Sequence, residues 1–165
     1  MRKLVRNLLL VVGGCALVLL LVETSRLMWV GSTELTVEFV ITDADTGQPL
    51  AGAEIAITSY GGFYEGGYRL REKGVREEEF TLKTDANGAA EYVCNGSMCS
   101  GQKSPLGSVN TFAVHMPYWH ITVKAPGYAV PEPVQLDSQN GRSAERTGPR
   151  RSKVVVPLAL HRAAP

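Results

Sequence analysis

Two cysteines stand close together in the segment Cys94-Asn95-Gly96-Ser97-Met98-Cys99. Gly96 gives the backbone between them freedom to turn. In a domain held outside the cytoplasm, thiols this close can be oxidised to a disulfide that closes a small loop. Such a loop would add about 2 kcal/mol to stability through chain entropy. We predict a Cys94–Cys99 disulfide; the alternatives are two free thiols or half of a metal site.

The histidines of the chain are His115, His120 and His161, and they are the residues that could join those cysteines around zinc. The spacing argues against this, because the sequence has no paired C-x-x-C and no H-x₃-H on a helix. His115 and His120 fall on two strand-like segments separated by Pro117. We therefore predict ordinary strand histidines, no metal site and no cofactor.

Nucleophilic catalysis has no recognisable signature in the sequence. There is no G-x-S-x-G elbow, and the serines fall in predicted turns and loops without a base partner. The residues thus predict no catalytic group, and we expect that the chain is not an enzyme.

The N-terminus combines charge and hydrophobicity in the order typical of exported proteins. Arg2, Lys3 and Arg6 precede an apolar run, Leu8–Val22, whose 15 residues would span roughly 22 Å as a helix. Adding residues 4 and 5 brings the segment close to the ~30 Å hydrocarbon core of a bilayer. We predict a signal-anchor or transmembrane segment over residues 1–25, in the membrane through residues 4–22. The basic flank stays cytoplasmic, and the rest is extracytoplasmic, that is periplasmic.

This segment has two other possible fates. A cleaved signal peptide needs a small-residue A-x-A-like site, and none follows Val22. A lipoprotein would be lipidated at Cys15, because Val12-Gly13-Gly14-Cys15 resembles the bacterial lipobox. Cleavage there would leave an apolar start, Ala16–Val22, on the mature chain. All three alternatives export the domain.

Beyond a linker at residues 26–33, which carries an interfacial Trp29, hydrophobicity alternates with period two. Leu35, Val37, Phe39 and Ile41 share one face of a predicted strand, and polar residues occupy the other. Similar short segments recur between turns up to residue 160, without intervening helical stretches. The sequence predicts an all-β domain over residues 34–161: an antiparallel Greek-key β-sandwich of seven or eight strands after one N-terminal helix.

Two predicted loops are candidate binding surfaces. The glycine-rich segment 60–68 presents Tyr60, Phe63, Tyr64 and Tyr68, which suit stacking on sugars or packing against a partner protein. The alternative is an aromatic loop folded back onto the sandwich. The segment Arg142–Lys153 carries four arginines and one lysine against Glu145, and it suits anionic headgroups or cell-wall polymer. The alternative is a solvated loop. Nucleic acid is excluded, because the formal net charge of the chain is only +1.

Three motifs carry a family resemblance. They are the opening Val40–Ile55 with its Asp43-Ala44-Asp45-Thr46-Gly47 turn, the turn Thr84–Gly88, and Val123-Lys124-Ala125-Pro126-Gly127-Tyr128. In order and spacing they resemble carboxypeptidase regulatory-like domains, a group of transthyretin-like, prealbumin-type sandwiches. The resemblance spans residues 34–160 and implies a seven-stranded accessory domain. The chain ends in residues 160–165, LHRAAP, without the Tyr-Arg-Gly-Ser ending of the related hydroxyisourate hydrolases.

The predicted membrane segment, the predicted β-sandwich and the two predicted loops together indicate a function. We expect a non-catalytic, membrane-anchored, extracytoplasmic binding or scaffolding module of the bacterial cell envelope. Its expected partners are the membrane and an envelope protein or carbohydrate. One alternative is an accessory subunit that stabilises or positions an envelope peptidase or glycan-processing enzyme; another is a lipoprotein lipidated at Cys15.

Overall fold

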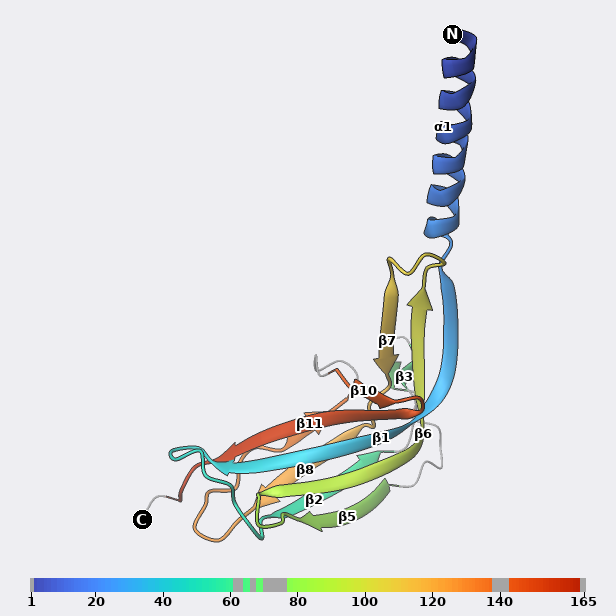
Figure 1. Ribbon diagram of the computed structural model, residues 1–165. Helices are drawn as coiled ribbons and strands as arrows, with labels where there is room; N and C mark the ends of the chain where they lie inside the picture. The colour runs from blue at the N-terminus through green and yellow to red at the C-terminus, as the bar shows by residue number, and fades with distance from the viewer. Residues whose placement is uncertain (1, 61–63, 66–67, 70–76, 138–142, 164–165) are drawn as a thin grey trace. The chain divides into compact units, whose positions relative to one another are not determined.

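The computed structural model describes residues 2–60, 64–65, 68–69, 77–137 and 143–163 (Figure 1). These residues form one helix followed by β-strands. The elements are α1 (Arg2–Thr24), β1 (Leu27–Asp43), β2 (Glu54–Tyr60), β3 (Tyr64–Glu65), β4 (Tyr68–Arg69), β5 (Glu77–Lys83), β6 (Ala89–Lys103), β7 (Asn110–Val114), β8 (Trp119–Lys124), β9 (Val134–Leu136), β10 (Glu145–Gly148) and β11 (Arg151–Leu160).

Helix α1 is the one N-terminal apolar helix that the sequence predicted. Its segment Val5–Thr24 has 20 residues and a mean hydropathy of 2.4, and none of it is buried within the protein. At 1.5 Å per residue it is about 30 Å long, the thickness of a hydrocarbon core. By length and composition the helix can cross a membrane or serve as a signal sequence.

The strands form the two sheets of a sandwich. One sheet has the order β10-β11-β1-β6-β7 and the other β5-β2-β8-β9, while β3 and β4 pair separately. A mostly β sandwich is therefore confirmed. It is not wholly antiparallel, because β1 and β11 run parallel from Glu34 beside Arg151 to Asp43 beside Leu160. These strands come from opposite ends of the domain, so no tight hairpin constrains their direction.

The predicted alternation of the first strand is confirmed. Leu35, Val37, Phe39 and Ile41 of β1 are fully buried. Apolar side chains of the second sheet are buried with them, because each strand turns one face inward. They include Ile55 and Ile57 of β2, Trp119, Ile121 and Val123 of β8, and Leu136 of β9. Aromatic rings join this core: that of Trp119 lies 6.5 Å from Phe39, 5.6 Å from Phe80 and 5.4 Å from Tyr92 between centroids.

The chain divides into two compact units. The first unit comprises residues 1–31 and 99–113, and the second comprises residues 32–98 and 114–165. In the first unit Trp29 stacks on Phe112 with a centroid distance of 6.1 Å. Gly101 makes room for this pair, because a Cβ there would lie 2.7 Å from the Trp29 indole. Most of the predicted linker at residues 26–33 is thus the beginning of strand β1.

Cys94 and Cys99, the pair predicted to form a disulfide, are free thiols in this structure, and the disulfide stays a prediction. Both residues lie on strand β6. The backbone between them turns at Gly96, whose φ is +75°. Burial raises the pKa of the Cys94 thiol to about 11.

Candidate functional site

The arginine-rich segment that the sequence assigned to a loop is a β-hairpin. Strand β10 pairs with β11 through Glu145 beside Lys153 and Arg146 beside Ser152, and the register shifts between Arg146 and Gly148. The Arg146 guanidinium donates hydrogen bonds of 3.1 Å to the carbonyl oxygens of Gly148 and Pro149. Because the Arg146 side chain bonds two backbone carbonyl groups of the turn, it restrains the backbone from residue 146 to 150.

Strand β1 fixes the other side of this hairpin. The Glu34 amide donates to the Arg150 carbonyl oxygen at 2.9 Å, and the hydroxyls of Thr33 and Ser152 lie 3.1 Å apart in a buried contact. Arg151 Nε lies 3.5 Å from Glu34 Oε1, with the two side chains 74% and 40% exposed. An ion pair this exposed contributes little to stability, so Arg151 can exchange its partner at small cost.

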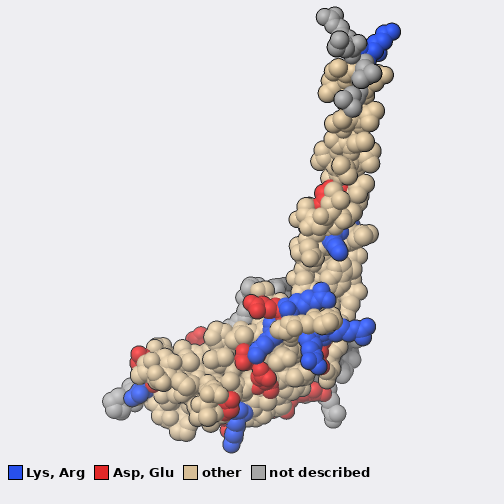
Figure 2. Space-filling view, viewed as in Figure 1, with Lys and Arg blue, Asp and Glu red and all other residues tan. Residues whose placement is uncertain are grey.

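A cleft of about 630 Å³ opens where β1 meets this hairpin. It is lined by Ser32, Thr33, Glu34, Gly96, Thr147, Gly148, Pro149, Arg150 and Arg151. Lys and Arg side chains gather over β10 and the start of β11 (Figure 2). Arg150 is exposed, and among the described residues its guanidinium has no hydrogen-bond or ion-pair partner. We call this site the arginine cleft.

The composition of the arginine cleft suits an oxyanion. Two arginines and one glutamate leave its lining with a formal charge of +1. A guanidinium presents a planar set of N–H donors that matches carboxylate and phosphate oxygens in pairs. Hydroxyls of Ser32 and Thr147 add neutral donors. The volume lies within the range of small-molecule sites, about 300–1,000 Å³.

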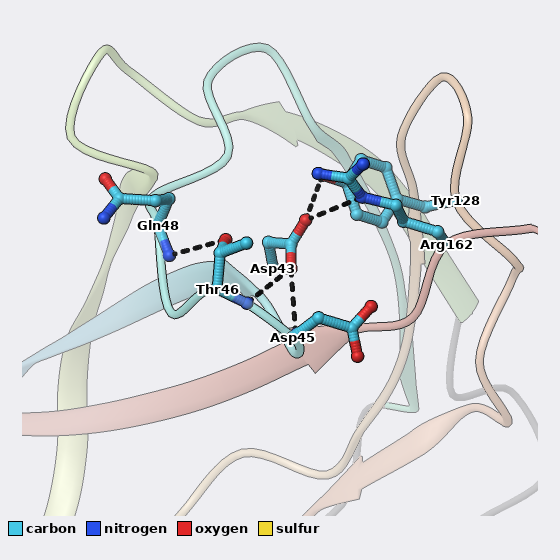
Figure 3. Close-up of polar contacts among 6 residues, drawn as sticks. All are labelled: Asp43, Asp45, Thr46, Gln48, Tyr128 and Arg162. Carbon is cyan, nitrogen blue, oxygen red and sulfur yellow. Dashed lines mark hydrogen bonds and ion pairs between the residues drawn. The ribbon is translucent and has the colours of Figure 1, made fainter.

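A second polar cluster surrounds Asp43, a carboxylate whose side chain is 2% exposed. Its Oδ2 accepts hydrogen bonds from the Tyr128 hydroxyl at 2.7 Å and Arg162 Nε at 3.2 Å, while Oδ1 accepts from the amides of Asp45 and Thr46 at 2.9 Å (Figure 3). These hydrogen bonds hold the pKa of Asp43 well below its usual range, and the bond from Tyr128 has the largest effect. With every acceptor direction used, this cluster is a structural joint without capacity for a ligand.

The histidines do not converge. His120 lies on β8 with Nε2 3.4 Å from the Tyr118 hydroxyl. The His115 amide donates to the Met98 carbonyl, and the His161 carbonyl accepts from the Ala129 amide. Within the part of the chain that the structure describes, no group of three or more His, Cys, Asp and Glu side chains is placed to hold a metal ion. Cys15 is exposed on α1.

The aromatic residues predicted as a ligand-binding loop cannot be compared with the cleft. Phe63 and the side chains of Tyr60, Tyr64 and Tyr68 lie outside the described residues, and only the backbones of the three tyrosines fall in strands, β2, β3 and β4. Sequence reasoning missed Ser32, Thr33 and Glu34 as lining residues, because nothing in their local pattern links them to residues 147–151.

Comparisons with known proteins identify the fold. No family model and no curated protein matches the sequence. Among solved structures, catechol 1,2-dioxygenase from Acinetobacter sp. ADP1 matches with TM-score 0.50 and 20% identity over 81% of this chain. Catechol 1,2-dioxygenase from Acinetobacter radioresistens matches with TM-score 0.51 and 17% identity over 81% of this chain. The 3-chlorocatechol 1,2-dioxygenase from Rhodococcus opacus 1CP matches with TM-score 0.51 and 14% identity over 79% of this chain.

This chain is similar to only part of those enzymes. The matches cover 54%, 53% and 60% of their respective chains, so this protein spans little more than half of their length. At identities of 20% or less the likeness is one of fold.

The match corrects several predictions. The sandwich is similar in fold to that of catechol 1,2-dioxygenases, so the assignment to transthyretin-like carboxypeptidase regulatory-like domains is wrong. The fold match also contradicts the predicted function, a non-catalytic binding or scaffolding module with its accessory-subunit and lipoprotein alternatives. The exclusion of an enzyme falls too, because the matched sandwiches belong to enzymes. The turn motifs misled because short turns of this kind serve unrelated sandwiches.

Proposed function

We propose that this protein is a membrane-anchored, extracytoplasmic sandwich that takes up a small ligand bearing phosphate or carboxylate groups in the arginine cleft. The observation that carries the proposal is the pair Arg150 and Arg151 on the rim of a cleft of about 630 Å³. Arg150 is exposed and without a side-chain partner among the described residues, so an incoming anion displaces no bond to any of them.

The placement outside the cytoplasm is supported by α1 and its charges. Arg2, Lys3 and Arg6 precede or begin the segment Val5–Thr24, and basic residues beside a spanning helix remain on the cytoplasmic side. A single pass then puts the sandwich on the periplasmic side. Intact mass of the membrane form tests this: a retained Met1–Thr24 supports an anchor, and a mass lacking it contradicts one.

The affinity should depend on both arginines. A hydrogen bond to a charged group contributes about 1.5–3 kcal/mol, and each 1.4 kcal/mol is tenfold in affinity. Arg151 must first leave Glu34, but their exposed 3.5 Å pair offers little resistance.

Calorimetric titration of the full chain in detergent with inorganic phosphate and with citrate tests the proposal. We expect saturable binding that weakens at least about tenfold in Arg150→Gln and in Arg151→Gln. Lys124→Gln is the matched control, because it removes one positive charge from an exposed site on β8 outside the cleft. Binding that all three variants weaken equally, or no binding to either probe, contradicts the proposal.

A second candidate function is action on a small aromatic diol, the substrate class named for the matched enzymes. The fold likeness over about four-fifths of the chain favours it. The pair Tyr118 and His120, 3.4 Å apart, would take a proton from a hydroxyl of such a ring, since imidazole is the commonest general base near neutral pH. Oxygenases often hold a transition metal with His and carboxylate ligands. The described residues provide no such group, so we derive no metal-dependent step.

Oxygen uptake separates this candidate from the first. If the protein acts on catechol, the full chain should consume oxygen in proportion to added catechol, and His120→Gln should abolish this while Arg150→Gln leaves it unchanged. An absence of catechol-dependent uptake would eliminate the candidate.

A further inference from the structure

The end of α1 is bonded to the β6–β7 hairpin within the first unit. Glu23, in the last turn of the helix, accepts hydrogen bonds from the Ser104 hydroxyl at 2.6 Å, the Leu106 amide at 2.8 Å and the Ser108 amide at 3.1 Å. The Ser108 hydroxyl donates to the same carboxylate. Both carboxylate oxygens are therefore engaged by the tip of the hairpin, residues 104–109.

This tip is itself closed by short-range bonds. The Ser104 amide donates to the Val109 carbonyl at 2.8 Å, the Gly107 amide donates to the Ser104 carbonyl at 3.1 Å, and the Val109 amide donates to the Ser104 hydroxyl at 3.0 Å. Gly107 has a φ of +82°, which favours glycine at this position. A compact turn bonded to Glu23 lies at the level of the last turn of α1.

Several large apolar side chains are exposed around this joint. Leu106 is 63% exposed at the tip, and Leu27, Met28 and Val30 at the start of β1 are 67%, 78% and 72% exposed. Trp29, stacked on Phe112, lies on the same stretch of chain, and tryptophan concentrates at membrane–water interfaces. Arg26 and Lys103, both exposed, add positive charge suited to lipid headgroups.

We propose that this joint, the Glu23 clamp with the apolar side chains Leu106, Leu27, Met28 and Val30, docks the hairpin onto the outer headgroup layer of the bilayer that α1 crosses. The occupant follows from continuity. Val5–Thr24 fills a hydrocarbon core, so Glu23 lies at its edge, and the tip bonded to Glu23 lies in the adjoining interface. The inference rests on the anchoring part of the proposed function.

The clamp also solves a solvation problem. A carboxylate at the edge of the hydrocarbon loses part of its water, and charged groups there are costly unless they are hydrogen-bonded. The amides of Leu106 and Ser108 with the two serine hydroxyls replace that water. In return, the helix end fixes the depth of Leu106.

Brominated phospholipids, which quench tryptophan fluorescence on contact, test the docking. The full chain and its Leu106→Trp variant are reconstituted into phosphatidylcholine vesicles with bromine on the acyl chains near the headgroups. We expect the emission of the added tryptophan, the difference between variant and parent, to be quenched relative to unbrominated vesicles. Glu23→Ala in the Leu106→Trp background should lose that quenching, because the tip is released. Glu132→Ala, which removes an exposed carboxylate of the second unit and no bond to the hairpin, should retain it.

Carbonate extraction distinguishes a failure of the membrane anchor from a failure of the docking. Protein that carbonate removes from the vesicles has no spanning helix, and then the anchoring part of the proposed function fails first. Protein that resists carbonate while the added tryptophan is not quenched overturns the docking alone. Quenching that Glu23→Ala does not change overturns the clamp as its cause.

Discussion

The hydroxyl of Tyr128 donates a 2.7 Å hydrogen bond to Asp43, a carboxylate that ends strand β1 85 positions earlier in the chain. The same Asp43 oxygen accepts from Arg162, and a β-bridge joins Tyr128 to Arg162. The joint thus ties together the end of β1, the turn after β8 and the segment after β11. These contacts explain why an aspartate at position 43 and a tyrosine at position 128, each in one of the motifs noted in the sequence, matter to this fold.

Loss of the Tyr128 hydroxyl should loosen this joint. Tyr128→Phe removes one donor and leaves a buried carboxylate oxygen short of a partner, which costs more than the bond itself is worth. We expect the thermal unfolding midpoint of the full chain to fall by about 4 °C or more, measured by circular dichroism. Tyr118→Phe, just before β8, is a control for the loss of a tyrosine hydroxyl outside the joint. Equal effects of the two changes would contradict a special role for Tyr128.

Asp43 should also make stability depend on pH in the acid range. Its folded-state pKa is lowered, chiefly by the bond from Tyr128. A depressed carboxyl contributes stability that is fully present above its unfolded pKa of about 3.9 and is lost as the pH falls below it. Urea unfolding between pH 6 and pH 2 should therefore show a steeper acid loss for the parent than for Asp43→Asn. Parallel curves for the two proteins would exclude Asp43 as a source of the acid sensitivity.

Substitutions at two glycines distinguish the cost of a left-handed backbone from the cost of steric crowding. Gly47 and Gly88 both have a φ of +70°, but a Cβ at Gly47 meets nothing within 4 Å, whereas one at Gly88 would lie 3.0 Å from the Pro49 Cβ and the Leu50 amide nitrogen. Gly47→Ala should therefore cost about 1–2 kcal/mol from the left-handed backbone alone. Gly88→Ala should cost more, because backbone must move as well. Urea unfolding measures the loss in free energy of unfolding for both variants. An equal loss would show that the turn at Gly88 can shift to accommodate the added Cβ.

The two cysteines of β6 should behave as unreactive thiols. Burial raises the pKa of Cys94 to about 11, and Cys99 is buried. At pH 8 only about one Cys94 in a thousand is a thiolate, the form that reacts with iodoacetamide. We expect slow alkylation of the folded protein and full alkylation of both in urea without reductant, read by mass spectrometry. A mass two protons lower, with alkylation only after reduction, would restore the disulfide prediction.

The sequence by itself determined the features that depend on neighbours along the chain. The apolar run of α1 and the alternation from Leu35 to Ile41 are local patterns, because a helix or a strand places residues on its faces by its own repeat. The turn at Asp43 is equally local, since its carboxylate bonds amides two and three residues ahead.

Only the tertiary structure decided which segments meet. The parallel pairing of β1 with β11 brings Thr33 beside Ser152, 119 positions apart, and so forms the arginine cleft. The Cys94–Cys99 spacing suggested a closed loop, whereas the structure places both residues on strand β6. Strand partners are chosen by burial and hydrogen bonding across the whole sheet, and these contacts leave no mark in local sequence.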